Sequence, residues 1–278
     1  MNELGFDVTT AIPWFPHEAE SPYVLVRVSE KNAQAMTAVV QDAFRRCYLT
    51  DAELRARVEE LEGELGGTPE ERQRQIIASK LPDPGSIMSG DFGEILVYFY
   101  HAVKAHPQTA FGPKKWRLKE SRTRTAPFSD VLHFVLPHWP QATAQDVLYC
   151  SEVKAKATNG ASTPIPDAIE GCQRDRVSRL ANTLNWLRDR AIGQNLGAVT
   201  IAQLNRFINA NDYPPAVRRF HAVAVVCAGL LEEQLNGAPE NPNADYTLVV
   251  IAVPHLQAVY TEVFEAVVNS DVLGDPME

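Results

Sequence analysis

The chain has 278 residues, of which 45% are apolar and 22% are charged, and this composition is typical of a globular protein with a sizeable core. No apolar run approaches the ~18 residues of a membrane span, and residues 1–13 lack the features of a signal peptide, so we expect no membrane association. Four widely spaced cysteines without a CxxC pair argue against a disulfide framework or a structural zinc site, and they favour a cytoplasmic location.

The formal net charge of -9 is unevenly distributed along the chain. Residues 1–93 carry 9 basic and 16 acidic side chains, residues 94–190 carry 14 and 9, and residues 191–278 carry 3 and 10. The total disfavours a polyanionic partner, because nucleic acids are held mainly by Lys and Arg. The basic middle segment is therefore where a nucleic-acid site is expected.

The first part of the chain has the patterns of a mixed α/β domain. Thr68, Pro69 and Glu71 form the start signal of a helix, with Thr68 as the N-cap. Two prolines and a glycine at residues 81–85 cannot continue a helix, so we predict a boundary there. The predicted domains are an accessory domain over residues 1–85 that docks a partner, and a second domain over residues 86–278. Before the boundary we expect a strand at 23–28 and helices at 33–48, 51–65 and from Thr68 onward.

The second part alternates helices and strands. Residues 91–104 are apolar on nearly every side, which predicts a buried helix. The strands at 130–136 and 146–154 are separated by a proline-rich turn, so we expect them to pair. The remaining predicted elements are a short strand at 115–119, a helix at 167–192 capped by Asp167 and Glu170, strands at 221–228 and 246–253, and a final helix at 255–270.

Two charged residues share one face of the strand at 146–154. Side chains alternate along a strand, so Glu152 and Lys154 point the same way, and their presence in an apolar strand indicates a function. Strand pairing would bring the carboxylate of Asp130 beside Glu152, and converging carboxylates suit Mg²⁺ or Mn²⁺. Lys154 could then assist a metal-bound water or stabilise a phosphate, and Glu94 on the buried helix offers a third carboxylate.

Each of these residues also has a structural interpretation. Glu94 follows Asp91 by three residues and could complete a capping box. Asp130 could be an ordinary acid at a strand edge. Glu152 and Lys154 could form an exposed ion pair worth about 0.2–1 kcal/mol.

The same residues resemble the PD-(D/E)XK nuclease superfamily over residues 87–228. Asp130 and the triplet Glu152-Val153-Lys154 match its Asp and ExK motif, and Glu94 matches the glutamate of the first core helix, although Ser129 rather than proline precedes Asp130. A closer similarity links the chain to the HamA family, the nuclease subunits of Hachiman anti-phage defence systems. It is carried by GDFGEIL at 90–96, LKESR at 118–122, SEVKA at 151–155 and RVSRLANTLNWL at 176–187.

The resemblance implies a PD-(D/E)XK restriction-endonuclease-like α/β core, a mixed sheet flanked by helices, preceded by the smaller α/β N-terminal domain. It implies a metal-dependent deoxyribonuclease that hydrolyses phosphodiester bonds. Asp130, Glu152 and the Val153 carbonyl would hold the metal, Lys154 would assist, and Glu94 would support the metal environment. It also implies a hetero-complex with a superfamily 2 helicase partner, HamB, which restrains the nuclease until the helicase meets aberrant DNA.

A basic run and two helix residues are candidates for DNA contacts. Trp116 could stack on a base and the basic side chains around it could track phosphates, while a solvated linker is the alternative. Gln173 and Arg176 lie on one helix face, with an ordinary polar face as the alternative. The basic residues of the run are Lys114, Lys115, Arg117, Lys119, Arg122 and Arg124.

Two other functions compete with a helicase-controlled nuclease. One is a non-catalytic nucleic-acid-binding or adaptor protein that retains the nuclease core without a divalent ion. The other is a stand-alone restriction-type endonuclease that cuts a defined sequence without a partner.

Overall fold

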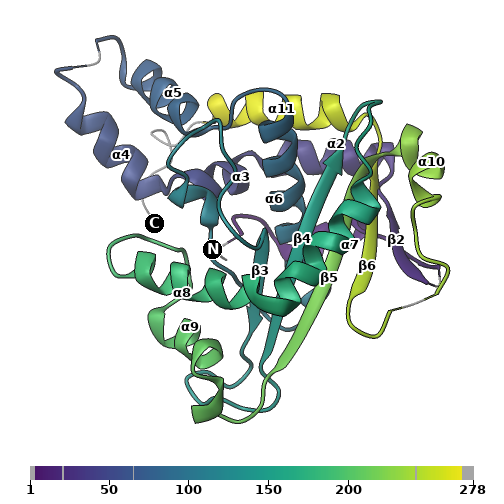
Figure 1. Cartoon of the computed structure of the whole chain (residues 1–278). Coiled ribbons are helices and arrows are strands. Elements are labelled where there is room, and N and C mark those ends of the chain that lie inside the picture. Colours follow the sequence, from purple (N-terminus) through teal and green to yellow (C-terminus); the bar gives the residue numbers. More distant parts are fainter. Residues whose placement is uncertain (1–3, 21, 65, 242, 271–278) are drawn as a thin grey trace.

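The computed structural model describes residues 4–20, 22–64, 66–241 and 243–270, and these residues form a sheet covered by helices on both faces (Figure 1). Six strands lie in the order β1-β2-β6-β5-β4-β3. The strands β2, β6, β5 and β4 run parallel to one another, and the edge strands β1 and β3 pair antiparallel with β2 and β4. The strands are β1 (His17–Glu20), β2 (Tyr23–Arg27), β3 (Val131–Val135), β4 (Val147–Lys156), β5 (Val217–Cys227) and β6 (Thr247–Val253).

Helices α6 and α11 pack on one face of the sheet and α7 on the other, which confirms the predicted mixed α/β sheet flanked by helices. The assignment to the PD-(D/E)XK superfamily stays a prediction. The helices are α1 (Val8–Ala11), α2 (Glu30–Val39), α3 (Gln41–Tyr48), α4 (Asp51–Glu60), α5 (Pro69–Lys80), α6 (Ser86–Ala105), α7 (Pro164–Arg174), α8 (Leu180–Ala191), α9 (Ile201–Ile208), α10 (Leu231–Leu235) and α11 (Leu256–Val268).

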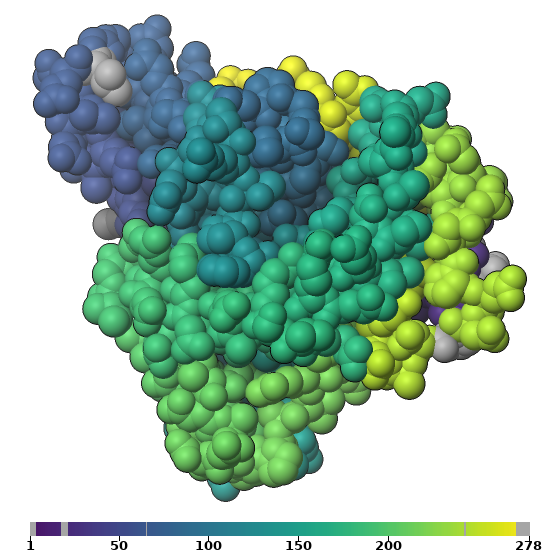
Figure 2. Space-filling view, in the orientation of Figure 1, coloured from purple at the N-terminus to yellow at the C-terminus, as the bar shows by residue number. Residues whose placement is uncertain are grey.

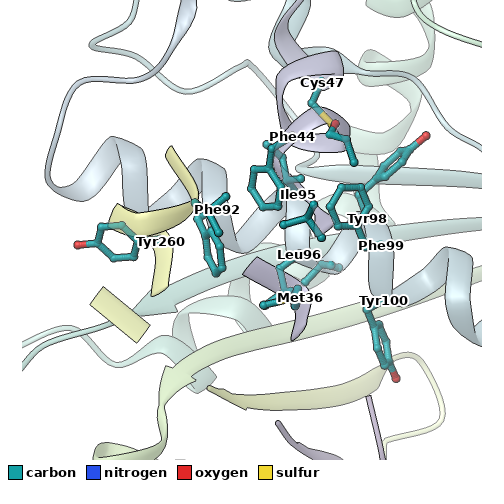
Figure 3. Close-up of a cluster of buried hydrophobic side chains, with 14 of the residues drawn as sticks. Met36, Phe44, Cys47, Phe92, Ile95, Leu96, Tyr98, Phe99, Tyr100 and Tyr260 are labelled. Carbon is teal, nitrogen blue, oxygen red and sulfur yellow. The ribbon is translucent and has the colours of Figure 1, made fainter. Parts of the chain in front are cut away.

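The largest hydrophobic cluster surrounds α6, which is buried on nearly every side as its sequence predicts. Figure 3 shows its aromatic centre, where the Phe44 ring stacks on Phe92 at a centroid distance of 5.5 Å and meets Phe99 edge-on at 5.4 Å. Burial of such rings is a dominant source of core stability. The position of α6 against β3 and β4 is thereby fixed.

Residues on both sides of the predicted boundary at residue 85 share this core. Strand β2 pairs with β6, and the cluster around α6 includes side chains from α2, α3, α4 and α5 as well as from α11. The division into domains over 1–85 and 86–278 stays a prediction, and Gly85 at its border has a φ of 106°, which glycine adopts readily.

Several predicted elements differ in detail. Residues 33–48 form two helices that meet at Val40, and Lys115–Leu118 is a short 3₁₀ helix rather than a strand, in which the adjacent residues Lys115 and Trp116 are both buried. The helix predicted at 167–192 begins at Pro164, so Asp167 and Glu170 do not form the predicted capping box; Asp167 instead accepts from the N–H of the N-cap residue Thr163. A π-helical turn at Asp175–Arg179 interrupts it.

Candidate active site

The predicted catalytic residues meet where β3 begins beside β4. Val131 pairs with Ser151, so one further step of this antiparallel register places Asp130 opposite Glu152. The Val153 backbone N–H donates to Asp130 Oδ2 at 2.8 Å, which ties the carboxylate to the adjoining strand. Most apolar residues of β3 and β4 are buried, and a shift of one residue would turn them toward the opposite face. The sequence therefore fixes this register.

Glu152 is a buried carboxylate held by two cations. Its side chain is only 2% exposed, and Oε1 accepts from Lys154 Nζ at 2.5 Å while Oε2 accepts from Arg179. Burial and the charge of Asp130 raise the pKa of Glu152 to about 7. The exposed ion pair considered as an alternative for Glu152 and Lys154 is therefore wrong.

Lys154 remains a charged group in this environment. Burial lowers its pKa, but the negative charges of Asp130 and Glu152 outweigh that effect and raise the pKa above its ordinary value. Its Nζ also lies 3.4 Å from the Val153 carbonyl oxygen. The ammonium thus contacts Glu152 and the strand backbone, and it is still 35% exposed.

Glu94 reaches the same region from α6. The helix begins at Ser86, so Glu94 lies in its interior and the capping-box alternative is wrong. Burial and the charge of Asp130 raise the pKa of Glu94 well above its ordinary value. Trp116 Nε1 donates to Glu94 Oε2 at 3.0 Å. The helix approaches β4 closely because Gly93 has no side chain; a Cβ there would lie 3.2 Å from that of Ala155.

Arg179 is the site residue that the sequence interpretation missed. Its guanidinium donates to Glu152, to Asp175 Oδ1 at 2.6 Å and to the Gly171 carbonyl at 3.0 Å. Arg179 is the last residue of the π-helical turn, and such turns are frequent at functional sites. The spacing of Asp175 and Arg179 by four residues was a visible ion-pair signal, but the contact with Glu152 depends on the docking of α7 onto β4.

Gly171 permits this docking. A Cβ at this position would lie 2.3 Å from Glu152 Oε1, so any larger residue would displace either the helix or the carboxylate. The absence of a side chain at Gly171 thus lets α7 pack directly against Glu152.

The chain also matches a known family. The family model of HamA matches residues 12–267. The chain belongs to the HamA family. This membership implies a role in Hachiman anti-phage defence. No curated protein matches the chain at a significant level.

Within the described residues of this HamA protein, no helix is long and apolar enough to cross a membrane.

The residues of the HamA protein offer oxygen donors for a divalent cation, but protein side chains alone do not fill its coordination shell. Among the described residues, no three His, Cys, Asp or Glu side chains are grouped closely enough to hold a metal by themselves. Burial and then the charge of Asp130 raise the pKa of both Glu94 and Glu152, so three carboxyl groups lie in one region. Carboxylates with the Val153 carbonyl are hard donors of the kind that Mg²⁺ prefers, and Mg²⁺ usually retains several waters. The donor chemistry therefore fits.

The first residues of the basic run do not have the predicted role in DNA binding. Lys114, Lys115 and Trp116 are at most 3% exposed, so they offer no surface to DNA, and base stacking by Trp116 is wrong. Their burial follows from the 3₁₀ turn, which directs Trp116 at Glu94. Lys119 binds Asp91 at 2.8 Å.

The other predicted DNA contacts are nearer the surface. Arg122 and Arg124 are exposed, and Arg122 pairs with Asp83 at 3.1 Å. Arg117 is partly exposed and donates to the Arg46 carbonyl and to Asn195. Their contact with DNA stays a prediction.

Gln173 and Arg176 are also exposed, and Arg176 pairs with Asp245 at 2.7 Å. Arg176 belongs to the π-helical turn, and Gln173 lies at the end of α7, so the regular helix spacing assumed from the sequence does not continue between them. A role in binding DNA stays a prediction for both.

Proposed function

We propose that this HamA protein is a metal-dependent deoxyribonuclease that hydrolyses phosphodiester bonds in DNA. The observation that carries the proposal is the juxtaposition of Asp130 with the buried, cation-paired Glu152 and with Lys154 in the second half of β4. A buried carboxylate whose pKa is raised, in direct contact with a lysine and an arginine, is costly to maintain without a function.

Asp130, Glu152 and the Val153 carbonyl would hold Mg²⁺ or Mn²⁺, with Glu94 supporting the site. When bound, the cation supplies Lewis-acid activation of water and of the scissile phosphate. Lys154 holds a positive charge beside the position where charge develops on the phosphate. Arg179 pairs with Glu152 and is itself oriented by Asp175, so it neutralises the carboxylate until a divalent cation replaces it.

Cleavage of supercoiled plasmid by the purified chain, with and without a helicase partner, tests the proposal. We expect cleavage in Mg²⁺ or Mn²⁺ but not in EDTA, and we expect Glu152→Gln or Lys154→Met to slow it by about 10²- to 10³-fold. Glu170→Gln is the matched control, because Glu170 is an exposed, ion-paired residue of α7. Full metal-dependent cleavage by a Glu152→Gln, Lys154→Met double variant would rule out this site.

The proposed partner is a superfamily 2 helicase that controls the nuclease in a hetero-complex, and family membership supports this. The proposed docking surface lies in the acidic segment over residues 1–85, where α4 and the turn after it expose Glu59, Glu60, Glu62 and Glu64. Reversal of these four charges is expected to reduce co-purification with the helicase. Undiminished co-purification would place the interface elsewhere.

A further inference from the structure

An aromatic side chain stands exposed two residues before Asp130. Phe128 is 38% exposed and has a φ of 67°, a left-handed conformation that is unfavourable for a bulky residue. Non-glycine residues in this region are strained and are concentrated at functional sites. The Phe128 ring is thus partly exposed to solvent. The contacts of the next residue, Ser129, maintain the backbone conformation.

Ser129 fixes the backbone on the far side of this strained residue. Its N–H donates to Thr183 Oγ1 at 3.1 Å, its Oγ donates to Asp175 Oδ1 at 2.7 Å, and its carbonyl accepts from Lys115. Ser129 is fully buried, so all three contacts are shielded from water. The bond to Thr183 ties the segment leading into β3 to α8, and on the face shown in Figure 2 green and teal surfaces adjoin.

The same docking brings a tryptophan and an arginine of α8 to Phe128. Trp186 lies one turn beyond Thr183, and its ring is T-shaped to Phe128 with a centroid distance of 6.1 Å. The guanidinium of Arg190, one further turn along, lies 5.7 Å from the Trp186 ring centroid. Trp186 is only partly buried, in contrast to Trp14 and Trp116, which are in the core.

We propose that Phe128, Trp186 and Arg190 form a platform that stacks the unpaired bases of single-stranded DNA beside the catalytic carboxylates. This inference deepens the proposed nuclease function and rests on it for its biological meaning. Aromatic rings with an adjoining arginine are the usual means of binding single strands without sequence preference. Bases within a duplex are already stacked on each other, so the platform would select single-stranded or melted DNA.

The charges around the platform favour a nucleic acid as its occupant. Arg188 and Arg190 of α8 are 36% and 41% exposed, and Arg124 is exposed four residues before Phe128. The ion pair of Arg190 with Glu120 has a separation of 3.4 Å and a strongly exposed carboxylate, so it contributes little and is easily exchanged for a phosphate. A wholly apolar ligand would offer no anionic group to any of these arginines.

Binding measured without cleavage tests the platform separately from catalysis. The probes are a fluorescein-labelled oligothymidylate of about 15 nucleotides and a blunt duplex of equal length, titrated in EDTA with the full chain and followed by anisotropy. Trp186→Ala removes the stacking surface for one base, so we expect it to weaken oligothymidylate binding by about 5- to 100-fold. Phe128→Gly, which removes the ring but accepts the positive φ, should weaken it less, and neither should change duplex binding appreciably.

Two variants keep the test decisive if Trp186→Ala perturbs folding. Trp186→Phe preserves an aromatic face and should retain most of the affinity. Trp139→Ala alters another partly exposed tryptophan beyond the opposite end of β3 and should leave binding unchanged. Equal losses for duplex and single strand, or no loss in Trp186→Ala, would overturn the platform. Tryptophan-dependent single-strand binding by a chain that cannot cleave DNA would support the platform while refuting the nuclease.

Discussion

Two arginine–carboxylate pairs lie along strand β4, one just before its first residue and one past its middle, and they differ in their access to solvent. Before the strand, Arg206 Nε donates to Asp146 Oδ2 at 2.7 Å, and the two side chains are 0% and 1% exposed. Further along the strand Glu152 is buried, but its partners Arg179 and Lys154 are 23% and 35% exposed. A ligand could therefore reach Glu152 by exchange with its cations, whereas the Asp146 pair is closed.

The closed pair has contacts that serve the fold. Asp146 also accepts from the Thr143 N–H at 3.0 Å, and Arg206 donates to the carbonyls of Thr143 and Pro214. These bonds tie α9 to the turn before β4. Glu152 instead has a raised pKa, because it is buried and lies opposite a second carboxylate, Asp130. The pair before the strand thus stabilises the fold, whereas the pair at Glu152 allows a change in charge.

The largest expected effect on stability concerns the closed pair. Asp146→Asn should lower the free energy of unfolding by about 3–5 kcal/mol, because it leaves the Arg206 guanidinium buried without a counter-charge. Urea denaturation measures the loss. The matched control is Asp189→Asn, which breaks an exposed pair and should cost less than about 1 kcal/mol. A loss no greater than that of the control would contradict the comparison.

Glu152→Gln should have the opposite effect on stability at high pH. The folded-state pKa of Glu152 is about 7 against an ordinary value of 4.5, so the folded protein retains a proton that the unfolded chain releases. The carboxylate therefore destabilises the fold progressively between these pH values, by up to about 3 kcal/mol above them. We expect the variant to exceed wild type in unfolding free energy at about pH 8 and to match it at about pH 4. Lower stability at about pH 8 would mean that the carboxylate is a structural element.

Gly171→Ala should disturb the contact between α7 and Glu152 by steric overlap alone. Its Cβ would clash with Glu152, so we expect a loss of about 1–3 kcal/mol in unfolding free energy. Gly90→Ala is the matched control, since this glycine also lies in a helix but no atom lies within 4 Å of its added Cβ. That substitution should stabilise α6 by about 0.5–1 kcal/mol. Thermal unfolding of both variants provides the comparison, and equal effects would show that α7 does not approach Glu152 this closely.

Arg179→Met should produce the smallest change, an increase in affinity for Mn²⁺. The guanidinium competes with a divalent cation for Glu152, and its removal should lower the apparent Kd by about five-fold, equivalent to roughly 1 kcal/mol. The electron paramagnetic resonance signal of free Mn²⁺ at about pH 8 measures this. Arg188→Met, on an exposed part of α8, is the control. Weaker binding in Arg179→Met would show that the arginine supports the cation.

The sequence predicted the part of the site that depends on strand periodicity. Glu152 and Lys154 share a face because β4 is regular, and Asp130 opposes them because apolar residues fix the register of β3. Both facts follow from local patterns.

The remaining parts depend on tertiary packing that no local pattern encodes. Arg179 reaches Glu152 through a π-helical turn, and Trp116 turns inward because its N–H meets Glu94. Likewise, β2 joins the sheet beside β6, more than 200 residues away in the sequence, so the place of the N-terminal segment could not be inferred from the charge distribution.

The most direct test of the catalytic centre is a crystal structure of the protein soaked with Mn²⁺, with anomalous data collected near the manganese edge. The account predicts an anomalous peak coordinated by carboxylate oxygens of Asp130 and Glu152, with Lys154 and Arg179 displaced from Glu152. A structure at saturating Mn²⁺ without a peak there, in which both cations still bind Glu152, would contradict it.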